Sequence, residues 1–166
     1  MDFASIYEAH SRAIYYLALR LLGDATRAED AAQDVFLKAF RNMAGFRHGS
    51  GIRTWLYRIA INHCQNLRQS WHQRNIETTG DGIVENGADA TRETPFRIAA
   101  LKDLGEQIQK CLDAIPAEYR LLVLLVADEE LSYEQIAELT RQSCDSVRGK
   151  LYRARKALKA ALEKTA

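Results

Sequence analysis

The hydrophobic positions of this 166-residue chain follow a helical repeat in two blocks, with a polar stretch between them. In the first block, apolar residues recur at three- and four-residue intervals, and this predicts helices over about 3–22, 25–43 and 52–70. In the second block the same spacing predicts helices over about 97–113, 116–127, 133–139 and 144–163. Because no strand-like alternation is visible, the pattern predicts an all-α fold.

Local signals support several of these helix ends. Gly23 suits the residue after the first helix, and Asp24 suits the N-cap of the second. Pro116 fits a helix first turn. Ser132 and Gln135 have the spacing of a capping box, which satisfies two amides at a helix start.

The polar stretch over residues 72–96 predicts a flexible linker. It holds three Gly, four Thr and five acidic residues, without helical periodicity. So long a stretch without secondary structure is unusual inside one compact domain. We therefore expect two small helical domains, 1–71 and 97–166, joined by an acidic linker.

The net charge of +1 conceals a strong sorting of charge along the chain. Residues 41–71 contain five Arg and no acid, and residues 139–166 contain eight basic and two acidic residues. The segment between them is acidic, with three basic and nine acidic residues over 98–138. A total near zero argues against a nucleic-acid-binding protein, whereas two separate basic segments are compatible with one.

Several classes of protein and site are disfavoured. The longest apolar run, Leu121–Ala127, is far shorter than the ~20 residues that span a bilayer, and the N-terminus lacks the pattern of a secretion signal. We therefore expect a cytoplasmic protein without membrane insertion. The three cysteines fit no metal or disulfide spacing, and His63-Cys64 with His72 fits no zinc pattern. We expect no metal, no cofactor and no catalytic constellation, and hence no enzyme.

The last predicted helix combines an apolar stripe with a basic surface. The stripe comprises Cys144, Val147, Leu151, Ala154, Leu158 and Leu162. A short helix and the turn Thr140-Arg141-Gln142 precede it, and Ser143 can cap it. A short helix, a tight turn and a long basic helix are typical of the helix-turn-helix, whose second helix enters the major groove of DNA. A solvated basic face on an ordinary packed helix is the plainer alternative.

The third predicted helix carries a polar face that includes Thr54, Arg58, Asn62, Gln65 and Gln69. We expect its apolar arc to comprise Ile52, Trp55, Leu56, Ile59, Ala60 and Leu67, with His63 as a packing residue beside it. Amides and Arg can bind base edges and phosphates, and Phe46, with Arg47 and His48 beside it, could stack on a base. An ordinary polar face explains this pattern equally well.

The second predicted helix buries Ala28, Ala31, Ala32, Val35, Phe36 and Ala39 on one stripe. Leu37 lies opposite this stripe, among Asp30, Gln33, Asp34 and Arg41. A lone exposed Leu is common in soluble proteins, but a Leu ringed by polar residues can also be the centre of a small protein-docking face. Both interpretations stay open on the pattern alone.

Six segments together resemble the extracytoplasmic-function (ECF, group IV) sigma factors of the sigma-70 family. Region 2 of that family is similar to residues 28–40, to Phe46-Arg47 and to the segment 54–62. Region 4 is similar to residues 115–120, 131–137 and 147–155. The segments occur in the family's order over nearly the whole chain, with the linker where the family has one. The resemblance implies a region 2 helical bundle and a region 4 helix-turn-helix.

The resemblance also implies roles for these surfaces. It implies that the β′ clamp helices of core RNA polymerase are bound by Asp30, Gln33, Asp34, Leu37 and Arg41. Recognition of the melted non-template strand of the −10 element falls to Phe46, Arg47, His48, Arg58, Asn62, Gln65 and Asn66. Reading of the −35 duplex falls to Ser146, Arg148, Gly149, Lys150, Tyr152 and Arg153, and region 4 would also touch the polymerase β flap. An anti-sigma factor is a further expected partner.

Three departures from the family pattern concern the −35 reader. Gly149 stands where Ser is frequent, Asp145 places an acid at the helix start, and the turn before this helix lacks the usual Gly.

Two rival functions also remain at this stage. A stand-alone helix-turn-helix regulator leaves Leu37 and its acidic surroundings without a role, and a protein-binding helical adaptor leaves the basic helix without one.

Overall fold

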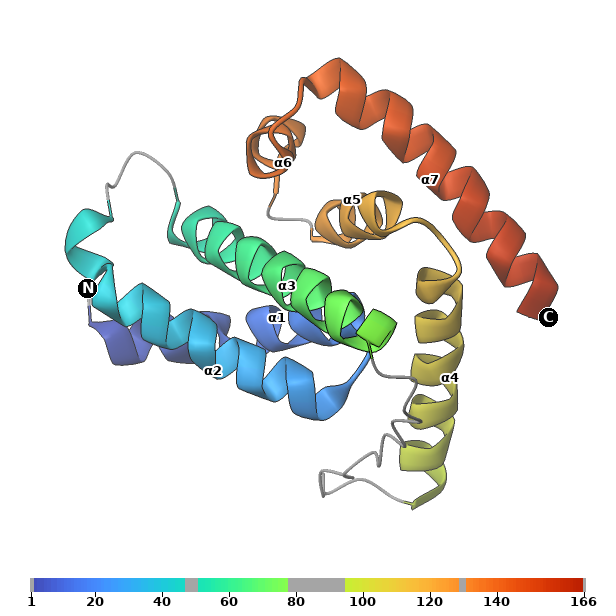
Figure 1. The fold of residues 1–166 in the computed structure, drawn as a ribbon, viewed down its shortest axis with the longest axis horizontal. Coiled ribbons are helices and arrows are strands. Elements are labelled where there is room, and N and C mark those ends of the chain that lie inside the picture. Colours follow the sequence, from blue (N-terminus) through green and yellow to red (C-terminus); the bar gives the residue numbers. More distant parts are fainter. Residues whose placement is uncertain (1, 47–50, 78–94, 129–130, 166) are drawn as a thin grey trace. The chain divides into compact units, whose positions relative to one another are not determined.

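The structure, a computed structural model, describes residues 2–46, 51–77, 95–128 and 131–165. All regular elements in these ranges are helical, which confirms the all-α prediction (Figure 1). They are α1 Phe3–Leu22, α2 Ala25–Arg41, the short 3₁₀ helix η1 Met43–Gly45, α3 Ile52–Glu77, α4 Pro95–Asp113, α5 Ala117–Ala127, α6 Tyr133–Thr140 and α7 Cys144–Thr165. The chain divides into two compact units, unit 1 (Met1–Gly87) and unit 2 (Ala88–Ala166).

The junction of α1 and α2 forms as the sequence predicts. Gly23 takes a left-handed conformation with φ 76°, and its amide donates to the carbonyl of Leu19. Asp24 then caps α2, because its carboxylate accepts from the amide of Thr26 at 2.9 Å. These two residues reverse the chain and let α1 and α2 pack side by side (Figure 1).

The core of unit 1 lies between α1, α2 and α3. The predicted stripe of α2 is confirmed at five positions, since Ala28, Ala31, Val35 and Ala39 are fully buried and Phe36 nearly so. The sixth, Ala32, is only half-buried. Small residues on this stripe allow the helices to approach closely, while the larger side chains of α1, such as Ile14 and Leu17, fill the remaining space.

The predicted apolar arc of α3 is partly wrong. Leu67 is exposed, whereas Thr54, which we assigned to the polar face, is only 2% exposed, and Tyr57 is buried. The arc that is buried comprises Thr54, Leu56, Tyr57, Ala60, Ile61 and Cys64. Because α3 packs against both α1 and α2, it buries a broad arc, and that arc is rotated from the one that we predicted.

The end of α3 also differs from the prediction. The helix continues to Glu77 instead of ending at about 70, so the first residues of the expected linker are helical. No Gly or Pro occurs between residues 71 and 79, and hence no local signal stops the helix there. α4 likewise begins at Pro95, inside the expected linker, whereas the rest of that segment, residues 78–94, lies outside the described residues.

Unit 2 contains α4 to α7. On α7, the centre of the predicted stripe is confirmed, since Val147, Leu151 and Ala154 are buried. The stripe is wrong at its end, because Leu162 is half exposed and its neighbour Ala161 is buried instead. Ala161 joins a small apolar cluster that links the end of α4 to α7, with Cys111, Leu112 and Ile115.

A buried cation closes the turn between α4 and α5. Arg120 is only 7% exposed, and its guanidinium donates to the carbonyl of Leu112 at 2.7 Å and to that of Ile115 at 3.4 Å. It also lies 4.0 Å from the carboxylate of Asp113. These acceptors lie at or beyond the end of α4, where helix carbonyls lack intrahelical partners. Pro116 is the N-cap of α5, one position earlier than the first turn that we predicted.

Candidate functional site

The polar face of α2 is exposed as predicted. Asp30, Gln33, Asp34 and Arg41 are all exposed, and Leu37 stands among them with 53% of its surface accessible. Their spacing keeps all five within one arc of the helix, opposite the buried stripe. An accessible Leu between two acids and an amide is an arrangement that can form a small protein-docking face.

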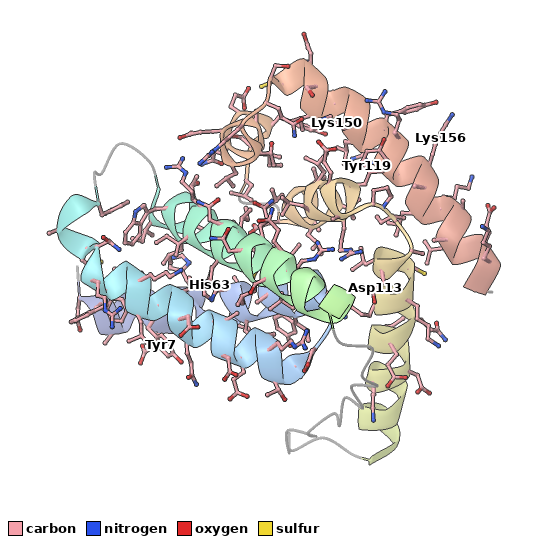
Figure 2. The ribbon with its side chains drawn as sticks, viewed as in Figure 1. Tyr7, His63, Asp113, Tyr119, Lys150 and Lys156 are labelled. Carbon is pink, nitrogen blue, oxygen red and sulfur yellow. The ribbon has the colours of Figure 1, made fainter. Side chains whose placement is uncertain are left out.

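This face is tied to α3 through His63 (Figure 2). Lys38 Nζ lies 2.9 Å from His63 Nδ1, and Asp34 Oδ2 lies 3.4 Å from Nε2 on the other side of the ring. Burial lowers the pKa of His63 below 6.5, Lys38 lowers it further, and Asp34 acts in the opposite direction. His63 is therefore a polar link between two helices, and our expectation of a simple packing residue was incomplete.

Two exposed aromatic residues of unit 1, Phe40 and Tyr7, were missed from the sequence. Phe40 on α2 is 61% exposed, and its ring lies 5.2 Å from that of Phe3 on α1. Tyr7 of α1 is also exposed (Figure 2). Its ring packs edge-on against that of Phe36, with ring centroids 4.9 Å apart. The helical spacing already indicated that Phe40 is exposed, because it lies about 120° around α2 from the centre of the buried stripe. An aromatic residue at that position does not contribute to the core.

The predicted amide face of α3 is exposed. Asn62, Gln65 and Asn66 are accessible, and Arg58, one turn before Asn62, is half-buried. Before the helix, Phe46 packs against Trp55, with ring centroids 5.1 Å apart. Arg47 and His48, the other two predicted residues of this site, lie outside the described residues.

The helix-turn-helix forms from α6, a tight turn and α7. Ser132 and Gln135 make the predicted capping box at the start of α6, and Ser143 accepts from the amide of Ser146 at the start of α7. In the turn, Arg141 takes the left-handed conformation with φ 56°, which is the position where a Gly would be unstrained.

A chain of hydrogen bonds fixes the turn to both helices. The hydroxyl of Ser146, a predicted DNA-contacting group, donates to Gln142 Oε1 at 2.9 Å. The amide of Gln142 donates to Thr140 Oγ1 at 2.8 Å, and that hydroxyl donates to the carbonyl of Ile136 at 2.7 Å. The Thr140-Arg141-Gln142 sequence therefore supplies side-chain bonds in a turn that lacks Gly.

The cations of α7 lie in different surroundings. Arg148 is largely exposed, 3.8 Å from the carboxylate of Asp145 and over the ring of Tyr133 at 5.8 Å. Lys150 is less accessible and forms an ion pair with Glu118 of α5, a contact that the sequence did not reveal. Sequence spacing could not indicate this ion pair, because the two residues are 32 positions apart in the chain.

The remaining predicted residues of this surface are accessible. Tyr152 and Arg153 are exposed, and the ring of Tyr152 carries Lys156 Nζ at 4.7 Å from its centroid. Gly149 has open space around it, since an added Cβ would approach only the Arg153 guanidinium, at 3.9 Å. A Ser at this position, as is frequent in the family, would fit without rearrangement.

The described parts of the chain hold no group of three or more His, Cys, Asp or Glu residues that could bind a metal. Cys64 and Cys111 are buried, and burial raises the pKa of the Cys64 thiol to about 11. In the same parts of the chain, no helix is long and apolar enough to cross a membrane.

A helix-turn-helix with a basic second helix, in one chain with a helical unit that exposes Leu37 among polar residues, is typical of a DNA-binding protein. Comparison with known proteins makes this specific. The model of Sigma-70 region 2 matches residues 6–74, and that of Sigma-70 region 4 matches residues 105–158. The chain belongs to the sigma-70 family, and its relatives place it among the ECF sigma factors.

Two curated relatives illustrate the match. The RNA polymerase sigma-H factor of Pseudomonas aeruginosa is 34% identical over 152 residues, which cover 89% of this chain and 79% of the relative. The ECF RNA polymerase sigma-E factor of Escherichia coli is 31% identical, over 78% of this chain and 70% of the relative.

The fold is also found in a solved structure. The sigma factor RpoE from Bartonella quintana, in complex with the anti-sigma factor NepR, superposes with a TM-score of 0.79 at 22% identity, over 98% of this chain and 97% of that one. This likeness supports the two-unit helical fold. Membership of the family removes both rival functions, because neither a stand-alone regulator nor an adaptor accounts for matches to regions 2 and 4 in one chain.

Proposed function

We propose that this sigma factor binds core RNA polymerase through the exposed face of α2. The contact comprises Asp30, Gln33, Asp34, Leu37 and Arg41, and its partner is the clamp-helix segment of the β′ subunit. The exposure of Leu37 carries this proposal, because burying a large apolar side chain that is otherwise in water stabilises a complex by about 1.5–3 kcal/mol. The surrounding acids supply orientation more than affinity.

Promoter recognition is divided between the two units. Asn62, Gln65 and Asn66 of α3 bind an unstacked base of the −10 element, with Arg58 on the backbone and with Phe46, Arg47 and His48 from the preceding loop. Amides suit this task, because they form hydrogen bonds to the edges of a base that has left the duplex. Unstacking costs a few kcal/mol, so these contacts must offset it.

Unit 2 reads the −35 element as duplex DNA. Arg148, Lys150 and Arg153, with Ser146, Gly149 and Tyr152, lie on or beside the accessible face of α7, which enters the major groove. Unit 2 also contacts the polymerase β flap. A net charge of +1 provides little non-specific attraction to DNA, and hence the polymerase supplies much of the affinity.

The chain itself directs initiation and leaves RNA synthesis to the polymerase, so it is a transcription initiation factor and not an enzyme. It acts in the cytoplasm, where its DNA and polymerase are. An anti-sigma factor is a further proposed partner, since the structural relative from Bartonella quintana was solved with one. Such a partner would compete with the polymerase for the exposed faces of both units.

The proposal is tested by Leu37→Asp in the full chain. We expect at least a tenfold loss of affinity for core polymerase, measured by fluorescence anisotropy of labelled protein, and an equal loss of run-off transcripts from a genomic library. A charge placed in an apolar contact loses the burial energy and adds a desolvation cost.

Two variants serve as controls. Leu37→Met keeps the apolar volume and should bind as the natural chain does. Tyr16→Asp places the same charge at an exposed aromatic residue of α1, outside the proposed face, and should also bind normally. If Leu37→Asp binds core polymerase as tightly as Tyr16→Asp, the docking face is wrong.

A further inference from the structure

Glu118 is the one residue of α5 whose side chain forms a described ion pair with the recognition helix. Its carboxylate accepts from Nζ of Lys150, which lies on α7 (Figure 2), so the pair joins two helices of unit 2. The side chain of Lys150 is 29% exposed and that of Glu118 is 55% exposed. A pair with one partly buried partner is less screened by salt than a fully exposed pair.

Arg148 and Arg153, the other two cations of α7 that we assign to DNA, have no described ion pair with another helix. Arg148 has its nearest acid, Asp145, on its own helix, and both of these side chains are largely exposed, so that pair is weak. Arg153 lies over Gly149, and within the described parts of the chain no ion pair to it is found. Lys150 is thus the DNA-facing cation whose charge is most nearly neutralised inside the protein.

We propose that Glu118 is a specificity-determining residue of the duplex-reading unit. Its ion pair with Lys150 weakens the attraction of that lysine to the phosphates of DNA of any sequence. A non-specific phosphate contact would have to replace the ion pair with Glu118, and the exchange would gain little free energy. At the cognate element, α7 seats fully in the groove, and a closely held phosphate or guanine edge then competes for Lys150. Glu118 therefore lowers non-specific binding more than specific binding.

This inference rests on the proposed function, since it requires α7 to bind duplex DNA. Its quantitative basis is counterion release: each phosphate that a protein neutralises adds about 0.9 to the slope of log affinity against log salt. Freeing Lys150 should therefore add one phosphate contact on DNA of any sequence. Between 50 and 200 mM salt, one such contact changes affinity by roughly threefold.

The test measures binding of the full-length chain to a labelled 30-base-pair duplex of random sequence across a series of NaCl concentrations. Glu118→Gln removes the partner of Lys150 and keeps the side-chain size. We expect it to bind the random duplex several-fold more tightly at low salt, with a slope steeper by about 0.9. In the Lys150→Gln background, Glu118→Gln should have no such effect, because there is no cation to release.

Two further variants separate the possible outcomes. Glu106→Gln removes an exposed acid from α4 of the same unit, and it reports the effect of net charge alone. If it strengthens binding as much as Glu118→Gln does, or if the effect of Glu118→Gln persists without Lys150, the inference is overturned. Arg153→Gln tests the underlying function: if it leaves binding unchanged, α7 is not the duplex-binding surface. If Arg153→Gln weakens binding while Glu118→Gln has no effect, only the role of Glu118 is lost.

Discussion

The two units of this sigma factor use different side chains on their proposed DNA-reading surfaces. Unit 1 exposes the amides of Asn62, Gln65 and Asn66 on α3, whereas unit 2 exposes the cations Arg148 and Arg153 on α7. Amides recognise the hydrogen-bonding edges of single bases but attract DNA weakly at a distance. Cations attract any duplex, and they act selectively only through contacts to base edges or to the shape of the DNA.

The units also differ in how polar groups are used inside them. In unit 1, the buried positions of α2 are apolar. Its polar contact with α3, between Lys38 and His63, lies beside this buried stripe. In unit 2, the buried guanidinium of Arg120 holds the carbonyls at the end of α4. The position of α5, and with it that of Glu118, therefore depends in part on this buried cation, beside the packing of Leu121, Leu122 and Leu125.

The largest expected effect breaks this dependence. Arg120→Met removes the donors to the carbonyls of Leu112 and Ile115, and we expect it to lower the stability of unit 2 by about 2–4 kcal/mol. Both tryptophans, Trp55 and Trp71, belong to unit 1. In urea unfolding, the helical circular-dichroism signal should therefore gain an early phase, while tryptophan fluorescence keeps its midpoint.

A matched control is Lys110→Met, which removes a charge from an exposed position of α4. It should leave both signals unchanged. If Arg120→Met also left both unchanged, its hydrogen bonds would contribute nothing net to unit 2.

The next effect sharpens the comparison of the two reading surfaces. Asn62→Ala should reduce promoter opening by the holoenzyme, measured by permanganate footprinting, by an amount equivalent to about 1–3 kcal/mol. It should leave the affinity of the free chain for duplex DNA unchanged. Arg148→Ala should weaken duplex binding by a similar amount, whatever the sequence of the −10 element. Equal losses of both activities in both variants would contradict the division of labour.

The smallest effect is a difference in pH dependence. The folded state lowers the pKa of His63 below its unfolded value of about 6.5, so the unfolded chain binds the proton more readily. The stabilisation of unit 1 is therefore complete above pH 6.5 and is lost as the pH falls from there through the folded pKa.

Tryptophan-monitored unfolding between pH 7.5 and 5.5 measures this change, and His63→Gln should flatten it. All four histidines precede residue 87, so unit 2 offers an internal reference without a histidine. A pH slope that is the same in His63→Gln as in the natural chain would assign the titration to another group.

The fold followed from the sequence closely wherever a local signal existed. Asp24, Ser132 and Gln135 were predicted as capping residues, and all three make the expected hydrogen bonds. The end of α3 was missed because no Gly or Pro marks it, so the linker was expected to begin too early. The roles of the DNA-facing and polymerase-facing residues stay predictions, because accessibility alone does not reveal what a surface binds.

By itself, the sequence determined the all-α class, the order of the helices, the caps at Asp24 and Ser132, and the family. These properties depend on residues that are near one another in the chain, or on motifs that recur in order. The tertiary structure alone decided which arc of α3 is buried, that His63 bridges Asp34 and Lys38, and that Glu118 pairs with Lys150. Periodicity shows which residues share a helix face, but only packing brings residues distant in the chain within the few ångströms at which ion pairs and hydrogen bonds act.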